Sequence, residues 1–226
     1  MKNAFYKFNL QLTDEQINKF NRYYELLVEY NERFNLTAIV DKNEVIIKHF
    51  VDSLLGAKFF NKGKLIDIGS GAGFPAIPLK IFNDNLEVTL VEATGKKCTF
   101  LEAVIKELDL KNIKVVNDRA EILGKNENFR EQFDYCSARA VARLNTLAEY
   151  CMPFVKVGGY FIPYKGDVVE ELADGKRAVK ILGGKIEKVE EFSLEEAKRS
   201  IVLVKKIEKT LNIYPRGNGK ERKKPL

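Results

Sequence analysis

The sequence predicts an α/β protein built on a doubly wound, mostly parallel sheet with an N-terminal helical cap. From Lys64 onward, short apolar runs with the character of strands alternate with segments of helical periodicity, which is typical of parallel strands joined by helices. A glycine-rich turn directly follows the first of these runs. The last two runs have no evident helix between them, which predicts a closing antiparallel hairpin and seven strands in all.

Residues 1–60 are expected to form the helical cap, packed on the core. Thr13 and Gln16 make a capping box at the start of a helix over 13–33, and apolar side chains recur along it at helical spacing. A second helix is expected over 43–59. The cap needs a partner for its apolar face, and the sheet domain is the available one.

Four polar residues of this cap are open to two interpretations. Asn35 and Thr37 follow the end of the first helix, where capping or turn formation is the expected role. His49 and Asp52 lie one turn apart on the second helix, which we expect to be outlying. For both, a structural hydrogen bond is favoured over a part in catalysis.

Residues 61–213 are expected to form the sheet domain, and residues 214–226 a basic tail, in one compact unit. The predicted strands are 65–68, 86–91, 113–116, 133–137, 159–164, 186–192 and 200–206. The predicted helices are 75–82, 95–108, a short one after Asp118, 140–150 and 167–177.

Composition excludes several classes of protein. A chain of 226 residues with 45% hydrophobic residues supports one large α/β domain, and it contains no apolar run of membrane-spanning length. The first residues lack the apolar core of a signal peptide, and the three cysteines lack paired spacing, so we expect a reducing, cytoplasmic location and no zinc site. A single histidine argues against a histidine-rich metal cluster or a Ser–His–Asp triad.

The turn after the first strand predicts a binding site for S-adenosylmethionine (SAM). Gly69, Gly71 and Gly73 form a GxGxG pattern, whereas the dinucleotide-binding turn has the spacing GxGxxG. Asp67 lies inside the strand just before the turn. This pattern suits SAM, whose amino-acid half has no pyrophosphate, and a purely structural tight turn is the alternative.

The ends of the next strands supply the remaining candidates, because ligands of open parallel sheets bind at the carboxyl edge. Glu92 ends the second strand, where an acid can accept both ribose hydroxyls, although an ordinary solvated acid is the alternative. Asp118 and Glu121 follow the third strand near the expected adenine edge, unless they only contact a helix dipole. Arg139 ends the fourth strand and faces the same crevice.

Basic residues at two places predict contacts to nucleic-acid phosphates. Lys165 ends the fifth strand, and the tail adds a group of cations: Arg216, Lys220, Arg222, Lys223 and Lys224. The alternative in each case is a solvated side chain. If the tail is an independent RNA contact, deleting residues 216–226 leaves cofactor affinity unchanged.

Six motifs, in this order, resemble the bacterial small-subunit ribosomal RNA methyltransferase G family: NLTAI at 35–39, HFVDSL at 49–54, DIGSGAGFPAIPL at 67–79, SARA at 137–140, YKG at 164–166 and YPRGNGKERKKPL at 214–226. The resemblance implies a class I SAM-dependent methyltransferase fold and methylation of N7 of a guanine in the decoding-region hairpin of 16S rRNA. By motif, it implies SAM contacts at Gly69, Phe74, Glu92, Ala93, Thr94, Ala120, Glu121 and Arg139. One departure is Ala76, where the family commonly has glycine.

The chemistry implied by the resemblance agrees with what the sequence lacks. Guanine N7 has a free lone pair, so methyl transfer needs orientation more than a general base. We therefore expect Arg139 to position the target and assign no other catalytic residue, no metal and no membrane contact. The expected partner is 16S rRNA or the small ribosomal subunit. Two alternatives remain, a small-molecule SAM methyltransferase and a non-catalytic SAM- or nucleotide-binding factor of ribosome assembly.

Overall fold

The computed structural model describes all 226 residues and contains one seven-stranded sheet in the order β3-β2-β1-β4-β5-β7-β6. The strands are β1 (Gly63–Ile68), β2 (Leu86–Val91), β3 (Ile113–Val116), β4 (Phe133–Arg139), β5 (Val155–Lys165), β6 (Gly184–Leu194) and β7 (Ala197–Lys206). The first five are parallel, and β7 pairs antiparallel with both β5 and β6. The predicted doubly wound sheet and its closing hairpin are both confirmed.

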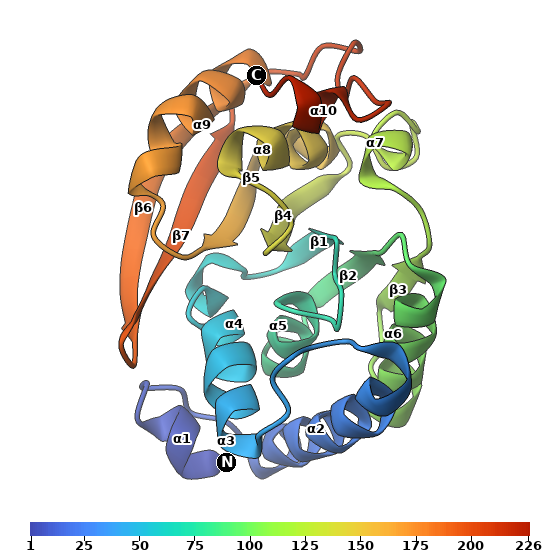
Figure 1. Cartoon of the computed structure of the whole chain (residues 1–226), viewed down its shortest axis with the longest axis vertical. Coiled ribbons are helices and arrows are strands. Elements are labelled where there is room, and N and C mark those ends of the chain that lie inside the picture. The colour runs from blue at the N-terminus through green and yellow to red at the C-terminus, as the bar shows by residue number, and fades with distance from the viewer.

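Helices cover both faces of this sheet (Figure 1), with α2, α4, α5 and α6 on one side and α8 and α9 on the other. The helices before β1 are α1 (Lys2–Tyr6), α2 (Asp14–Phe34), α3 (Lys42–Val45), the π-helical η1 (Ile46–Val51), α4 (Asp52–Leu54) and the 3₁₀ turn η2 (Ala57–Phe59). Those after β1 are α5 (Ala76–Phe82), α6 (Gly95–Glu107), α7 (Ala120–Leu123), α8 (Leu144–Cys151), the 3₁₀ turn η3 (Met152–Phe154), α9 (Val169–Ile181) and α10 (Lys220–Lys223). None combines the length and apolar character that crossing a bilayer requires.

The N-terminal helices share their apolar core with the sheet. Gln16 and Thr13 make the predicted capping box, and the Gln16 side chain also donates to the carbonyls of Ile81 and Phe82 at the end of α5. Tyr23 of α2 is fully buried and donates a hydrogen bond to the carbonyl of Ala72 in the glycine-rich turn. The cap therefore helps to fix the turn that follows β1.

Three departures from the predicted elements matter for function. The helix expected over 140–150 begins only at Leu144, which leaves residues 140–143 as a loop at the carboxyl edge. The helix expected over 43–59 is interrupted by η1, a π-helical stretch of the kind often found at functional sites. The segment predicted as a basic tail folds into α10 against α8 (Figure 1).

Candidate active site

The three glycines of the turn after β1 have different physical reasons for being glycine. All have positive φ angles, of 68°, 59° and 93° for Gly69, Gly71 and Gly73. A Cβ atom on Gly73 would lie 2.5 Å from the Tyr23 hydroxyl, and one on Gly69 would lie 2.7 Å from Val141. A Cβ on Gly71 would meet only the Gly69 carbonyl, at 3.8 Å. Only at Gly71, therefore, does the turn present backbone to open space, as a site for a closely bound ligand requires.

Glu92 fastens this turn to the end of β2. Its Oε2 accepts from the Gly71 amide at 2.9 Å and its Oε1 from the Thr94 amide at 2.8 Å. The residue is only 6% exposed, so the alternative of an ordinary solvated acid does not hold. A carboxylate offers about four acceptor positions. Both oxygens thus keep capacity for a ligand's hydroxyl groups.

A cavity of about 290 Å³ lies beside Glu92, near the lower end of the range for small-molecule sites. It brings together five predicted cofactor residues: Gly69, Glu92, Ala93, Ala120 and Glu121. Asp118 and Arg119 line it too, together with residues that the sequence did not single out, Ile68, Val91, Val141, Tyr150 and Gly219. Arg222 also lines it, although we predicted an RNA contact for that residue.

Asp67 lies fully buried in β1, before the turn. Its Oδ1 accepts from the Ser137 hydroxyl at 2.6 Å, whereas its Oδ2 has no partner. Burial raises the pKa of this carboxyl from 3.8 to about 7, although the Ser137 hydrogen bond acts to lower it. One acceptor next to the turn is thus unsatisfied, in a side chain that is fully buried and lines neither of the hollows described here.

A second hollow of about 340 Å³ is rich in cationic side chains. Its lining residues are Ile39, Lys48, His49, Asp52, Arg139, Ala140, Tyr164, Lys165, Gly166 and Arg199. Four of these are lysine or arginine, and only Asp52 is acidic. An anionic ligand such as a nucleotide phosphate fits this balance of charge.

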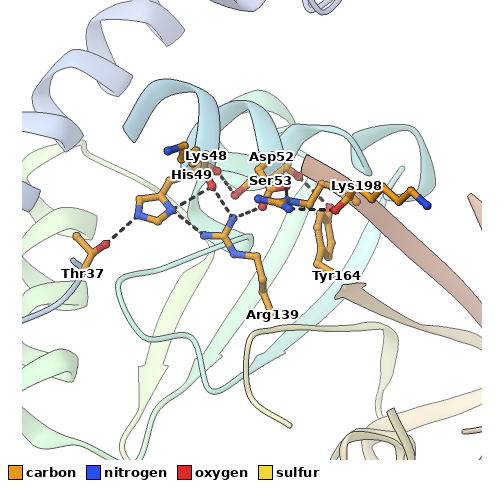
Figure 2. A network of polar contacts seen from close by, with 9 residues as sticks. Thr37, Lys48, His49, Asp52, Ser53, Arg139, Tyr164 and Lys198 are labelled. Carbon is orange, nitrogen blue, oxygen red and sulfur yellow. Dashed lines mark hydrogen bonds and ion pairs between the residues drawn. The ribbon is translucent and has the colours of Figure 1, made fainter. Parts of the chain in front are cut away.

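Arg139 is held in this second hollow by a polar network (Figure 2). Its Nη1 lies 2.5 Å from Asp52 Oδ2, while Arg199 Nε donates to the other oxygen of Asp52 at 2.9 Å. The Arg139 guanidinium also lies 5.0 Å from the ring centroid of Phe74. Arg139 and Phe74 therefore lie together but do not line the 290 Å³ cavity, although the resemblance groups them with the cofactor residues.

His49 is part of the same network, and the prediction of an outlying helix is wrong. Its ring stacks on Phe74 with centroids 4.6 Å apart, and its Nε2 lies 2.9 Å from the Thr37 hydroxyl. Burial and the nearby charge of Arg139 lower the His49 pKa from 6.5 to about 4.

His49 and Asp52 do not bond to each other, and each contacts Arg139. Figure 2 shows both side chains facing Arg139, with His49 coming from the π-helical η1 and Asp52 from the start of α4. Asn35 caps α2 in the left-handed conformation, with φ of 50°, as predicted.

The predicted RNA contacts divide into three groups. Lys165 pairs with Glu171 at 2.8 Å and donates to the Ala142 carbonyl, which fixes it at the rim of the second hollow. Arg216 is bound to the fully buried Glu149 through its backbone amide and its side chain. It is therefore not free for a phosphate, and that prediction is corrected. Lys220, Lys223 and Lys224 remain exposed.

A third hollow, of about 410 Å³, lies at the opposite edge of the sheet. Residues near the starts of β1 to β4 line it, among them Lys64, Glu87, Ile113 and Phe133. Ligands of open parallel sheets bind at the carboxyl edge. The two hollows beside Glu92 and Arg139 therefore make the better candidate site.

Comparison with known proteins agrees with this geometry. The family described as rRNA small subunit methyltransferase G matches residues 16–202. A Ribosomal RNA small subunit methyltransferase G of Lactobacillus acidophilus is 48% identical over 97% of this chain and 95% of its own length. The corresponding protein of Alkaliphilus oremlandii is 46% identical over 96% and 94%.

Solved structures at lower identity share the fold. A SAM dependent methyltransferase from Aquifex aeolicus superposes with a TM-score of 0.54 at 16% identity, covering 73% of this chain and 93% of its own. A mutant of MtNAS in complex with S-adenosylmethionine superposes with a TM-score of 0.56 at 15% identity, covering 85% and 76%. The chain belongs to the rRNA small subunit methyltransferase G family and is a SAM-dependent methyltransferase.

Proposed function

We propose that the protein transfers a methyl group from SAM to N7 of a guanine in 16S rRNA, within the small ribosomal subunit or its precursor in the cytoplasm. One observation carries the proposal, namely that the end of β4 is shared by the two hollows. Val141 lines the 290 Å³ cavity, while Arg139 and Ala140 line the cationic one. Cofactor and target nucleotide would thus bind on either side of three consecutive residues.

The residues of the first hollow fit SAM. Beside this hollow, the open space at Gly71 admits a ligand close to the backbone, and the buried Asp67 has an unpaired Oδ2 directly before the turn. Glu92 would accept from the ribose hydroxyls, and Ala120 and Glu121 would border the adenine. When bound, SAM supplies an electrophilic methyl group on a sulfonium.

The second hollow fits a nucleotide of the RNA. Lys48, Arg199 and Lys165 line it, each paired with one carboxylate, so a nucleotide phosphate would bind by sharing or replacing these pairs. The stacked rings of His49 and Phe74 supply an aromatic surface beside Arg139, as RNA-binding sites often use for unpaired bases. The names of the relatives, which specify ribosomal RNA of the small subunit, support this choice of substrate.

Reaction at N7 requires no proton transfer before the methyl group moves. The task of the protein is therefore to hold N7 in line with the methyl group and to keep water out, which alone can supply a large part of the rate. Arg139 is suited to this positioning because Asp52 and Phe74 fix its guanidinium. The lowered pKa of His49 leaves its ring neutral at physiological pH, so it adds no charge to the site.

The test is methyl transfer from radiolabelled SAM to 16S rRNA, supplied either free or in purified small subunits. N7-methylguanosine makes the chain cleavable by aniline after borohydride reduction, which locates the modified nucleotide. We expect label at one guanine, and none with a Gly71→Val variant that folds but does not bind SAM. Label at another atom or base would overturn the N7 assignment. Transfer only to small molecules, with none to rRNA in either form, would overturn the substrate.

A further inference from the structure

The segment from Thr210 to Leu226, here called the C-terminal strap, is built into the core. Arg130 ties down its first part with three of the four hydrogen bonds of its guanidinium. These three go to the carbonyls of Thr210, Leu211 and Tyr214, and the fourth goes to the carbonyl of Gly124 at the end of α7. A mobile basic tail would not satisfy a guanidinium in this way.

A buried ion pair then fixes the middle of the strap to α8. Glu149 is fully buried, and Arg216 gives it hydrogen bonds from its backbone amide, its Nε and its Nη2 at 2.7–2.9 Å. Glu221, also fully buried, accepts at its carbonyl from the Thr146 hydroxyl at 3.0 Å. Removing one partner of such a buried pair leaves an uncompensated charge, so the strap and α8 are held as a unit.

These anchors place the last turn of the strap at the cofactor cavity. Gly219 and Arg222 line the same 290 Å³ space as Glu92, Ala93 and Glu121. Figure 1 shows α10 lying beside α8 and near α7, the helix that carries Ala120 and Glu121. The strand ends provide one part of the cavity wall, and the strap completes it.

We propose that Arg222 binds the adenosine half of SAM and that the C-terminal strap is a wall of the cofactor site. The proposal rests on the cofactor assigned above. Adenosine is uncharged and has a flat π-face with acceptor nitrogens, which a planar guanidinium recognises by stacking and by hydrogen bonds. Arg222 is exposed and lines the cavity. Tyr150 of α8 also lines it but is only 6% exposed. Arg222 therefore has room to reach a ligand there.

The next two residues of the chain provide matched controls. Lys223 and Lys224 are exposed cations of the same strap, but neither lines the cavity. If the strap acted only through its charge on RNA, the three side chains would behave alike. If it acts as a cavity wall, only Arg222 affects the cofactor.

The experiment measures the binding of SAM and of 5′-methylthioadenosine by calorimetry, without RNA, to Arg222→Ala, Lys223→Ala and Lys224→Ala. We expect Arg222→Ala to lower the affinity for both ligands by the same factor, because both contain adenosine. The expected factor is about tenfold, which corresponds to about 1.4 kcal/mol. The two lysine variants keep wild-type affinity. Thermal melting of each variant shows that it is folded, which the exposed position of Arg222 favours.

Hydrogen exchange gives a second readout that a merely structural strap would not move. Adding SAM slows amide exchange over residues 217–224 in the wild type, and slows it less in Arg222→Ala. Wild-type affinity for both ligands in Arg222→Ala would overturn the inference.

In that case, RNA binding by Arg222→Ala would be measured at several salt concentrations. A slope of log affinity against log salt that is smaller by about 0.7 than in the wild type would assign Arg222 to a phosphate. Failure of the wild type itself to bind SAM would instead contradict the proposed function, so the two failures are distinguishable.

Discussion

Asp52 holds Arg139 with a distance of 2.5 Å between Oδ2 and Nη1, although the two residues are 87 positions apart in the sequence. The other oxygen of Asp52 binds Arg199, so one buried carboxylate orients two arginines from β4 and β7. Because both arginines line the cationic hollow, Asp52 sets the geometry of the nucleotide site without being placed to touch the cofactor.

Asp52→Asn therefore separates the two hollows. The amide keeps the size of the side chain but turns a donor toward one guanidinium, and a lost hydrogen bond between charged groups costs about 1.5–3 kcal/mol. We expect kcat/KM for rRNA to fall about 10- to 100-fold, with the affinity for SAM unchanged. Asp109→Asn is the control, since Asp109 pairs with Lys111 at the surface and lines neither hollow. An equal loss of SAM affinity in Asp52→Asn would mean that the network supports the cofactor as well.

Alanine at Gly71 and at Gly73 is expected to fail in different ways. Both positions have positive φ, which costs a non-glycine residue about 1–2 kcal/mol. At Gly73 the new methyl also collides with Tyr23 and Ile77, whereas at Gly71 it enters open space. We expect denaturant unfolding to show the larger loss of stability for Gly73→Ala. Calorimetry of the folded Gly71→Ala variant should show weakened SAM binding, although this variant loses less stability. Equal unfolding free energies for Gly71→Ala and Gly73→Ala would contradict the packing argument.

Glu92→Gln tests a carboxylate that serves two functions. Both oxygens accept from backbone amides, so a glutamine must place its NH₂ group against one of those donors. We expect SAM affinity to fall by about 10- to 100-fold, the equivalent of about 1.5–3 kcal/mol for a hydrogen bond to a charged group. The matched control is Glu87→Gln, an exposed acid at the other end of β2. Equal SAM affinities in the two variants would remove Glu92 from the cofactor site.

Local sequence patterns were sufficient for the sheet and for bringing five of the predicted cofactor residues to one cavity. Strands 86–91 and 113–116 have the predicted bounds, because each is an apolar run closed by polar residues. Once the strands are parallel, their ends meet at one edge, so Glu92, Ala120 and Glu121 come together as expected. This part of the site follows from elements whose residues are close in sequence.

The missed features all depend on contacts between distant residues. Glu149 looks like an ordinary acid within a helix, and only its partner Arg216, 67 positions later, explains why it is fully buried. The sequence predicts His49 to lie away from the site, because helical periodicity gives no sign of the π-helical segment. Tyr150 lines the cavity from α8, a helix that follows the fourth strand and that no sequence pattern places beside the cofactor residues.

Asp67 makes stability depend on pH in a defined window. Its pKa is about 7 in the folded protein against 3.8 for the unfolded chain, so the folded state binds the proton more tightly. Its contribution to stability is therefore fully present below about pH 4 and is lost as the pH rises to 7, by at most about 1.4 kcal/mol per pH unit. The Asp67→Asn variant does not show this loss of stability, because the asparagine side chain does not titrate.

The measurement for Asp67 is urea unfolding of wild type and Asp67→Asn, without SAM, at several pH values between about 4 and 7.5. Comparing the two proteins removes the opposite contribution of His49, whose lowered pKa makes stability rise with pH between about 4 and 6.5. We expect the unfolding free energy of the wild type to fall relative to that of Asp67→Asn as the pH rises. A difference that stays constant would show that Asp67 keeps an ordinary pKa in the folded state.

The chemical step is expected to be independent of pH near neutrality. His49 is the only histidine, and with a pKa of about 4 it stays neutral throughout the range of about pH 6–8.5. Asp67 has a pKa of about 7, but it is fully buried and takes no part in the chemical step, so single-turnover methylation rates at saturating SAM should be nearly flat over that range. His49→Ala removes the ring that stacks on Phe74 and should weaken RNA binding, but its remaining rate should show the same flat profile. His49→Phe keeps an aromatic ring that cannot accept a proton, so we expect it to retain most of the wild-type rate. A wild-type rate that rises tenfold per pH unit, and is lost equally in both variants, would make His49 the general base.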